Sequence, residues 1–263
     1  ELRAPVSNRT LRKLMRQFGS LGGGNHFLEL QVDNEDKLWV MLHSGSRYLG
    51  VQVRDWYTEQ GALQPGIDQR LYARIPYLPK DSPLANDYLA DMRLVVEFAR
   101  ESRCEMMLRT LEAVREFSRD LDVPALMDER FDINHNYVEL EQHFGEALFV
   151  HRKGAVRVNP GQKASIPGSM GTSSFVVEGR GTEHGFCSCA HGGGRRMSRA
   201  EATRRVTRKA YVESLANVVC AHSDLLLDEA PEAYKDIRTV MRAQADLVKT
   251  VAELRPVLSV KGR

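Results

Sequence analysis

Phe-Leu-Glu-Leu-Gln-Val at residues 27–32 and Leu-Trp-Val-Met-Leu-His at residues 38–43 are two short apolar runs separated by Asp-Asn-Glu-Asp at residues 33–36. Short runs of this kind, joined by a polar turn, are typical of neighbouring β-strands. The stretch therefore predicts two paired strands. His26 directly precedes the first strand and His43 ends the second, so the strand ends can direct both imidazoles toward one point.

Helix signals lie further along the chain. Ser-Pro at residues 82–83 combines an N-cap residue with a proline in the first turn, and the apolar residues that follow have helical spacing. Pro124 is expected to end this helical segment. Ser198 and Glu201 have the spacing of a capping box, and a basic helix is expected from there to about Cys220.

β patterns return at residues 147–158 and 173–177. Between them, Pro-Gly-Ser-Met-Gly-Thr at residues 167–172 predicts a loop whose amides and hydroxyls suit a nucleotide. Strand and helix signals alternate without regular βαβ spacing. The sequence therefore predicts an α+β, or irregular α/β, fold in a single domain.

Composition excludes several classes of protein. The 263 residues carry a net charge of +2, so the chain as a whole does not have the charge of a basic nucleic-acid-binding protein. The basic charge is unevenly spread, and residues 195–209 contain seven Arg or Lys residues and a single acid, Glu201. Four cysteines in a chain of this length make no disulfide framework, which predicts a reducing, cytoplasmic compartment. We found no membrane-length apolar run and no signal peptide, so no membrane partner is expected.

Four histidines lie in short motifs dense in glycine or polar residues: His26, His43, His135 and His191. The first three can each offer a neutral imidazole nitrogen to a divalent ion, with neighbouring carboxamides to fix the rings. The alternative for each is a hydrogen-bonded, buried histidine. A zinc finger is disfavoured because no Cys-x-x-Cys pair or His-x-x-x-His spacing is present.

His191 begins His-Gly-Gly-Gly-Arg, in which the glycines let a bulky group approach the ring and Arg195 can neutralise phosphate charge. Histidine can itself be a covalent nucleophile. The esterase interpretation of this motif requires a Gly-x-Ser-x-Gly nucleophile, which we did not find. The glycine run at residues 19–24 lacks the end of a P-loop. His-Arg-Lys-Gly at residues 151–154 either binds phosphate or is a solvated basic turn.

At these positions the chain resembles the RtcB family of RNA-splicing ligases. The matching motifs follow the family's order: Gly-Ser-Leu-Gly-Gly-Gly-Asn-His-Phe-Leu-Glu (19–29), His-Ser-Gly-Ser-Arg (43–47), His-Asn (135–136), His-Arg-Lys-Gly-Ala (151–155), Pro-Gly-Ser-Met-Gly-Thr (167–172), His-Gly-Gly-Gly-Arg-x-Met-Ser-Arg (191–199), Ala-Tyr-Lys-Asp-Ile (233–237) and Val-Lys-Gly (260–262).

The resemblance implies the family's α/β arrangement over residues 1–263, with the site in a deep central cleft. It also implies a GTP- and Mn²⁺-dependent ligase that joins an RNA 3′-phosphate or 2′,3′-cyclic phosphate to a 5′-hydroxyl, in tRNA splicing or RNA repair, with a possible activator protein. By motif position, His191 is the guanylylated residue, and His26, His43 and His135 are manganese ligands; the intact family site holds two manganese ions. The basic helix and the regions of Arg47 and Arg152 are expected to bind RNA phosphates. The implied guanylate pocket comprises Asn25, His26, Phe27, Leu28, Glu29, His135, Asn136, Pro167, Gly168, Ser169, Met170, Ser174, His191, Gly192, Gly193, Gly194, Tyr234 and Lys261.

The chain departs from the family pattern in two places. Gly193 stands where the family has alanine, which is expected to be tolerated at some cost in rigidity. The family's Asp-x-x-Cys metal motif has no match upstream of Gly19, so the chain is expected to be the C-terminal two-thirds of a longer member. Two alternatives stay open: a non-catalytic RNA- or guanylate-binding module with an incomplete metal site, and a metal-dependent phosphohydrolase acting on RNA ends.

Overall fold

The computed structural model describes residues 2–262 and divides into two compact units. The first extends to Gly22 and resumes over Ser44–Leu121, and the second comprises Gly23–His43 and the residues from Asp122 onward. The prediction of a single domain with a deep central cleft concerns the relation between these units, and it stays a prediction. The described part of the first unit is helical, and the second unit combines an antiparallel sheet with several short helices, so the chain has the expected mixture of helices and strands.

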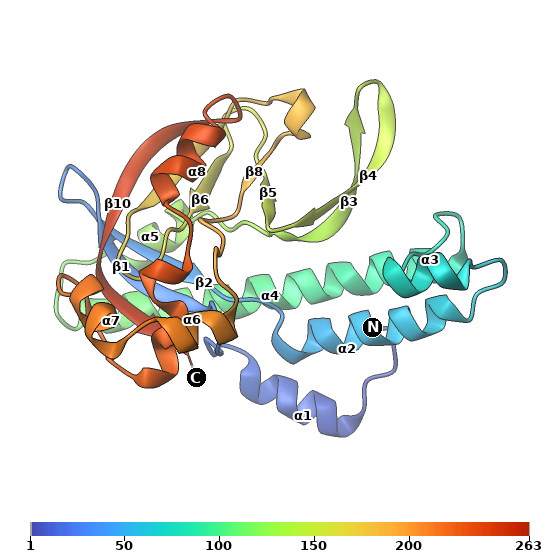
Figure 1. Cartoon of the computed structure of the whole chain (residues 1–263), viewed down its shortest axis with the longest axis horizontal. Helices are drawn as coiled ribbons and strands as arrows, with labels where there is room; N and C mark the ends of the chain where they lie inside the picture. Colours follow the sequence, from blue (N-terminus) through green and yellow to red (C-terminus); the bar gives the residue numbers. More distant parts are fainter. Residues whose placement is uncertain (1, 263) are drawn as a thin grey trace. The chain divides into compact units, whose positions relative to one another are not determined.

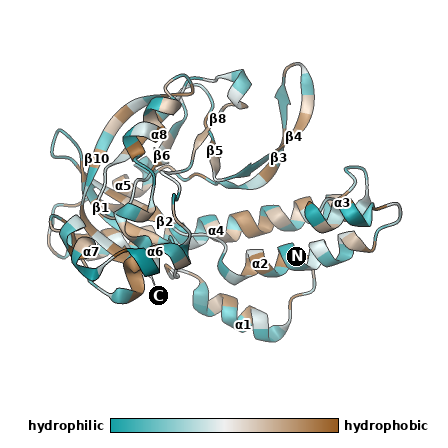
Figure 2. Ribbon diagram, viewed as in Figure 1, coloured by the Kyte–Doolittle hydropathy of each residue, from teal (hydrophilic) through white to brown (hydrophobic). Residues whose placement is uncertain are grey.

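The described part of the first unit is helical: α1 (Asn8–Gln17), α2 (Arg47–Ala62), α3 (Gln69–Arg74) and α4 (Pro83–Arg115) (Figure 1). Figure 2 shows hydrophobic and hydrophilic residues alternating along α4, as expected of a helix with one buried face. The core of the unit combines α1, α2 and α4 with the segment before α1. Its buried residues are Ala4, Leu14, Leu49, Val53, Tyr57 and Val95.

The predicted start of α4 is confirmed, because the Ser82 side chain accepts a hydrogen bond from the Ala85 amide. The predicted end is wrong. α4 stops at Arg115, and Pro124 lies in the first turn of a new helix, α5 (Val123–Glu129), capped by Asp122. A proline in the first helical turn removes no intrahelical hydrogen bond, so here it begins a helix instead of ending one.

The second unit is built on a curled sheet in which five strands follow the order β2-β1-β10-β7-β6 (Figure 1). All pairs along this path are antiparallel, and a short β9 (Val219–Cys220) adds to β10 in parallel. The predicted strand pair is confirmed with its predicted bounds. The strands of the path are β1 (Phe27–Val32), β2 (Leu38–His43), β6 (Lys163–Ile166), β7 (Ser174–Gly179) and β10 (Val248–Lys261).

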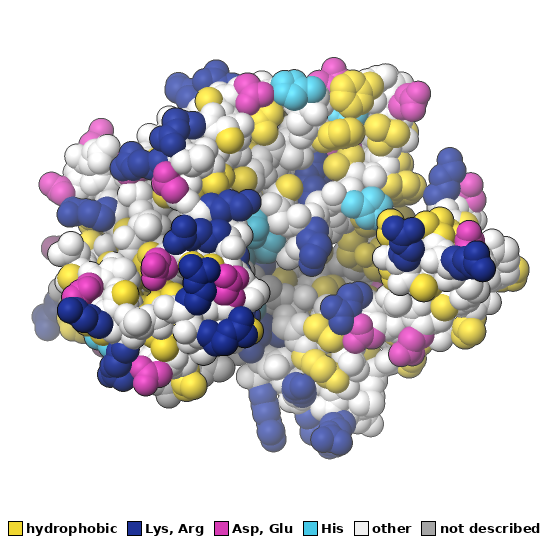
Figure 3. Space-filling view, in the orientation of Figure 1, with side chains coloured by type: hydrophobic (Ala, Val, Ile, Leu, Met, Phe, Trp, Pro, Cys, Tyr) yellow, Lys and Arg dark blue, Asp and Glu magenta, His cyan; other side chains and the backbone are white. Residues whose placement is uncertain are grey.

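The β pattern at residues 147–158 is divided between two strands. β4 (Glu146–Lys153) pairs with β3 (Asn136–His143), and β5 (Ala155–Arg157) pairs with β8 (Ser188–Ala190). The break falls at Gly154, whose φ of +71° is in the left-handed region that glycine adopts without strain. Figure 3 shows hydrophobic side chains gathered at the outer end of the β3–β4 hairpin, where Phe144 and Phe186 meet edge to face.

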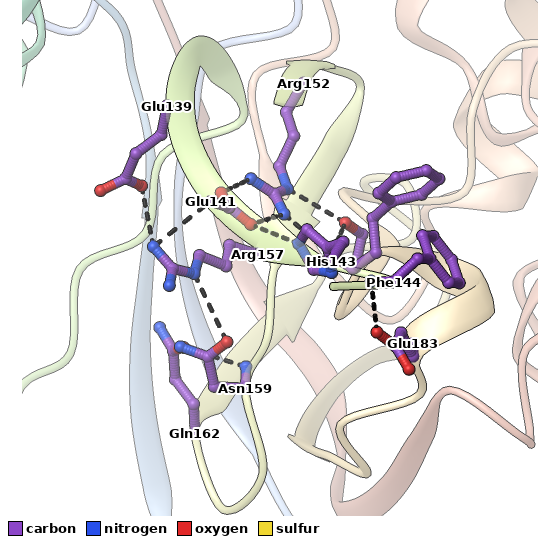
Figure 4. A network of polar contacts seen from close by, with 11 residues as sticks. Glu139, Glu141, His143, Phe144, Arg152, Arg157, Asn159, Gln162 and Glu183 are labelled. Atoms are coloured by element: carbon purple, nitrogen blue, oxygen red, sulfur yellow. Dashed lines mark hydrogen bonds and ion pairs between the residues drawn. The ribbon is translucent and has the colours of Figure 1, made fainter. Parts of the chain in front are cut away.

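A buried ion network fastens this hairpin (Figure 4). Arg152 Nη2 donates to Glu141 Oε2 at 2.9 Å and to the Phe186 carbonyl oxygen at 2.9 Å, and His143 contacts the same Glu141 oxygen at 3.0 Å. Burial would raise the pKa of Glu141, but hydrogen bonds from Arg152 and His143 lower it to about 2. Arg157 binds Glu139 at the exposed edge of the network.

The basic helix expected as far as Cys220 is interrupted. α6 (Arg199–Arg205) begins at the predicted cap, where Ser198 accepts from the Glu201 amide, but it ends at Val206. Thr207 then caps a second helix, α7 (Arg208–Ser214). The extended Val206 and the new cap explain the break. The remaining elements are η1 (Glu183–Gly185), η2 (Asp224–Glu229), η3 (Pro231–Ala233) and α8 (Ile237–Ala243).

Two apolar clusters support the site of the second unit. One packs β5, β6 and β7 against α8, with Val156, Ile166, Val177 and Ile237 at its centre. The other joins α6 and α7 to the Pro231 region and includes Met170 of the predicted nucleotide loop. Within residues 2–262, no helix combines the length and apolarity required to cross a membrane.

Candidate functional site

Four histidine rings form a continuous row in the second unit. The centroids of His26 and His43 are 5.6 Å apart, those of His43 and His135 are 4.9 Å apart, and those of His135 and His191 are 5.1 Å apart. The rings come from four separate segments of the chain. Phe27 is the cross-strand partner of His43 and stacks on its ring at 5.7 Å. The sequence-predicted convergence of these imidazoles is therefore observed.

Backbone geometry fixes the tautomer of His191. Its Nδ1 lies 2.8 Å from the Gly154 carbonyl oxygen, which can only accept a hydrogen bond, so Nδ1 carries the proton. The lone pair is then on Nε2. The His191 ring lies close to Gly154, because a Cβ added at Gly154 would lie 3.4 Å from the imidazole. Gly154, directly after β4, thus positions His191 through its backbone carbonyl.

Burial favours the neutral form of two of these imidazoles, because it lowers their pKa. It lowers the pKa of His43 well below its ordinary value, and proximity to His135, His26 and His191 adds to the effect. Burial also lowers the pKa of His191, against the opposing effect of the Gly154 hydrogen bond. Neutral imidazole is the form that acts as a nucleophile and as a metal ligand.

The donor chemistry of His26, His43 and His135 suits a divalent ion, because imidazole rings in mutual contact can supply nitrogen ligands. Over residues 2–262, however, no group of three or more His, Cys, Asp or Glu side chains has the arrangement of a metal site. Imidazoles alone also give no preference for manganese, which favours oxygen ligands. The two-manganese site stays a prediction.

A pocket of about 310 Å³ lies beside His43 and His191, at the lower end of the range of about 300–1,000 Å³ for small-molecule sites. The loop at residues 167–172 and the glycines after His191 form adjacent walls, and the Gly193 amide donates to the Pro167 carbonyl oxygen at 2.9 Å. The lining comprises Asn25, Phe27, Glu29, His43, Pro167, Gly168, Ser169, Met170, His191, Gly192, Gly193, Gly194, Arg195, Arg199, Glu229, Tyr234 and Lys261.

Five of the residues expected in the guanylate pocket lie outside this lining. His26 and His135 belong to the histidine row. Leu28 lies on the face of β1 opposite to Phe27 and Glu29, because side chains alternate along a strand. The remaining two are Asn136, which is exposed at the start of β3, and Ser174, which is buried and accepts a hydrogen bond from the Gly168 amide.

Glu29 is a buried carboxyl group of this pocket and is 3% exposed. Ser259 Oγ donates to its Oε1 at 2.9 Å, and Gln31 Nε2 donates to its Oε2 at 2.6 Å. Burial nevertheless raises the pKa of Glu29 to about 7, although these hydrogen bonds and the Lys261 charge oppose the rise. Gln31 Oε1 is buried with no hydrogen-bond partner among the described residues.

Glu229 is a lining residue that the sequence patterns did not indicate. Its Oε2 accepts from Lys261 Nζ at 2.9 Å and from the Tyr234 hydroxyl at 2.7 Å. Its Oε1 accepts from Arg199 at 2.6 Å and from Arg195 at 3.2 Å. Burial would raise the pKa of Glu229, but the Lys261 charge and hydrogen bonds from Tyr234 and Lys261 hold it below its ordinary value.

The expected phosphate-binding arginines differ in availability. Arg152 is 3% exposed and bound to Glu141, so its expected phosphate contact is wrong for this structure. Arg47 belongs to the first unit, where it donates to the Ser20 carbonyl oxygen at 2.6 Å. In Figure 3, Lys and Arg side chains over α6 are interspersed with acidic ones, in line with the Arg205–Glu201 and Arg208–Asp224 ion pairs.

Comparison with known proteins identifies relatives of the whole described chain. A family model described as "tRNA-splicing ligase RtcB" matches residues 2–262. The chain is 39% identical over 251 residues to the RNA-splicing ligase RtcB of Escherichia coli strain K12, covering 94% of this chain and 62% of that protein. It is 36% identical over 301 residues to the RNA-splicing ligase RtcB of Mycobacterium tuberculosis strain H37Rv, covering 98% and 68%. The chain thus spans less than two-thirds of the length of the E. coli relative.

Proposed function

The chain belongs to the RtcB family of RNA-splicing ligases, and we propose that the protein containing it joins an RNA 3′-phosphate or 2′,3′-cyclic phosphate end to a 5′-hydroxyl end. GTP is the proposed co-substrate, and tRNA halves or cleaved RNAs are the proposed substrates. The observation that carries the proposal is the row of imidazoles that ends at His191, with its Nε2 lone pair available beside the pocket.

In the proposed first step, His191 Nε2 attacks the α-phosphorus of GTP. A P–N bond forms, the bond from the α-phosphorus to the bridging oxygen breaks, and pyrophosphate leaves with that electron pair. The Nδ1 proton stays on the ring, and its hydrogen bond to the Gly154 carbonyl oxygen stabilises the positive charge that develops. The lowered pKa of His191 keeps the nucleophile unprotonated at neutral pH.

The guanylyl group would then pass to the RNA 3′-phosphate, which makes GMP a leaving group for attack by the 5′-hydroxyl. His26, His43 and His135 would hold manganese, whose charge would polarise the reacting phosphate when bound. The pocket lining from the loop at residues 167–172, together with Glu29, Tyr234 and Lys261, would bind the guanylate. Exposed basic residues of α6 and α7 would contact RNA phosphates.

All four cysteines are free. This supports the proposal that the protein acts in a reducing compartment such as the cytoplasm.

A labelling experiment tests the nucleophile. Wild-type protein incubated with GTP labelled at the α-phosphate and Mn²⁺ should acquire a covalent label that is stable to alkali and lost in acid, as expected of a phosphoramidate. His191→Ala should abolish the label. His184→Ala is the matched control, because His184 is exposed and pairs with Asp246 away from the pocket lining.

Persistence of the label in His191→Ala would contradict the proposed nucleophile. Wild-type protein that binds GMP without forming an adduct would favour a non-catalytic guanylate-binding module. Release of phosphate from RNA ends without an adduct would favour a phosphohydrolase. Ligation of a defined pair of RNA ends, with and without GTP and Mn²⁺, completes the test.

A further inference from the structure

We propose that Glu229 is the positioning residue of the nucleotide pocket: its single carboxylate holds the Lys261 ammonium, the Tyr234 hydroxyl and the guanidinium groups of Arg195 and Arg199 in place. This inference rests on the proposed function. Glu229 would act on the bound nucleotide indirectly, through the lysine, tyrosine and arginine side chains that it contacts.

The contacts of Glu229 join parts of the chain that are distant in sequence. Glu229 ends η2, Lys261 ends β10, and Arg199 begins α6. Every Lys and Arg in the described lining of the pocket donates to Glu229. One carboxylate therefore contacts all the described cations of the lining, although Arg195 also donates to the Asp228 carbonyl oxygen and Arg199 also donates to the Asp228 carboxylate.

Burial makes this dependence strong. The side chains of Glu229 and Lys261 are 3% and 4% exposed, so water compensates poorly for the loss of either partner. A buried ammonium without an anion is strongly disfavoured. If Glu229 lost its charge, Lys261 would have to move toward water or lose its proton, and the pocket wall would change in either case.

The charge balance of this cluster suits an anion. Lys261, Arg195 and Arg199 bring three positive charges, and Glu229 and Asp228 bring two negative ones. While the neighbouring Glu29 keeps its proton, the cluster has a net positive charge that can attract a phosphate, and Glu229 offsets the repulsion among the cations. Tyr234 adds a neutral donor that Glu229 orients.

The test compares Glu229→Gln with Glu232→Gln in the protein that contains this chain. Glu232 lies three positions further along, in η3, outside the pocket lining. We expect Glu229→Gln to weaken GMP binding about ten- to hundredfold by calorimetry, as for the loss of a buried charge-assisted hydrogen bond. KM for GTP should rise by a similar factor. The maximal rate of His191 labelling should change much less, because Glu229 makes no hydrogen bond or ion pair with His191 in the described structure. Glu232→Gln should match the wild type.

A double-mutant cycle separates positioning from general destabilisation. Lys261→Met and Glu229→Gln/Lys261→Met remove the buried ammonium, so the double variant should fold even if Glu229→Gln alone does not. We expect Glu229→Gln to weaken GMP binding far less in the Lys261→Met background than in the wild type. Glu229→Asp should recover part of the affinity.

Three results would overturn the inference: unchanged GMP affinity in Glu229→Gln, an equal effect of Glu229→Gln in both backgrounds, or an equal loss in Glu232→Gln. These results leave the proposed function intact, because wild-type labelling is measured in the same series. Wild-type protein that neither binds GMP nor becomes labelled would overturn the function and this inference together.

Discussion

Glu29 shows how one buried carboxyl group can link the pocket to pH. An unfolded chain loses this proton near pH 4.5, whereas the folded protein keeps it until about pH 7. The folded state therefore binds more protons than the unfolded state between these values. The stabilising contribution of the group is complete below pH 4.5 and is lost as the pH rises through 7.

We expect Glu29→Gln, which is neutral at every pH, to remove this dependence. Relative to the wild type, the variant should gain about 2.5 kcal/mol of unfolding free energy between about pH 5 and about pH 8. Urea denaturation of both proteins at the two pH values measures the change. A difference between the two proteins that does not vary with pH would mean that Glu29 ionises near its ordinary pKa.

Two glycines of the pocket should respond in opposite ways to alanine. At Gly193 an added Cβ meets the Lys235 carbonyl oxygen at 3.6 Å, an ordinary contact, and the residue does not have positive φ. Gly193→Ala should therefore stabilise the protein by about 0.4–1 kcal/mol, because it restricts the unfolded chain. At Gly168 an added Cβ would overlap the Ser173 carbonyl oxygen. Gly168→Ala should destabilise the loop by about 1–3 kcal/mol.

Thermal denaturation of the two glycine variants, followed by GMP binding, checks both signs. Because position 193 is expected to tolerate alanine, the affinity of Gly193→Ala for GMP should equal that of the wild type. A loss of stability in this variant would show that the His191–Gly194 loop requires the flexibility of glycine.

The β3–β4 hairpin depends on its buried ion network because neither strand pairs with another sheet. Glu141→Gln leaves Arg152 buried without its anion, so we expect a loss of about 3–5 kcal/mol in unfolding free energy. Glu139→Gln is the matched control. Its partner Arg157 is half-exposed, and the loss should stay below about 1 kcal/mol. Urea denaturation at neutral pH measures both, and equal losses would contradict the role of burial.

β10 and the α6–α7 break show which elements local patterns miss. Pro256 lies inside β10, and a proline normally argues against a central strand. Here it pairs with Gln31 at the register shift after Leu30, where the ladder is already irregular. By contrast, the β1–β2 pair was predictable because a polar turn and two apolar runs are sufficient to specify it. The Val206 break involves no Gly or Pro, so no strong local signal marks it.

Across the whole chain, the site was predictable where its residues lie in motifs. His191, in its glycine-rich motif, and residues 167–170 of the predicted nucleotide loop line one pocket. Glu229 was not predictable, because a carboxylate after Leu-Leu-Leu-Asp has no local feature that distinguishes it from a surface acid. Its role depends on Lys261 and Arg199, which only the folded chain brings to it. Long-range electrostatics is therefore the part of the site that the sequence patterns left out.

The near balance of charge over the chain also predicts how RNA binding should depend on salt. The chain has 37 basic and 35 acidic residues, so the proposed contribution of this chain to RNA binding would come from local groups that are not already paired. Arg204 on α6 is exposed and makes no ion pair among residues 2–262, whereas its neighbour Arg205 is bound to Glu201 at 2.8 Å.

We expect Arg204→Gln to weaken binding of single-stranded RNA of any sequence and to reduce the slope of log affinity against log salt by about 1. Arg205→Gln should change the slope less, because Glu201 already offsets its charge. Filter binding over a range of salt concentrations measures both slopes, and an unchanged slope in Arg204→Gln would exclude this face of α6 from the RNA-binding surface.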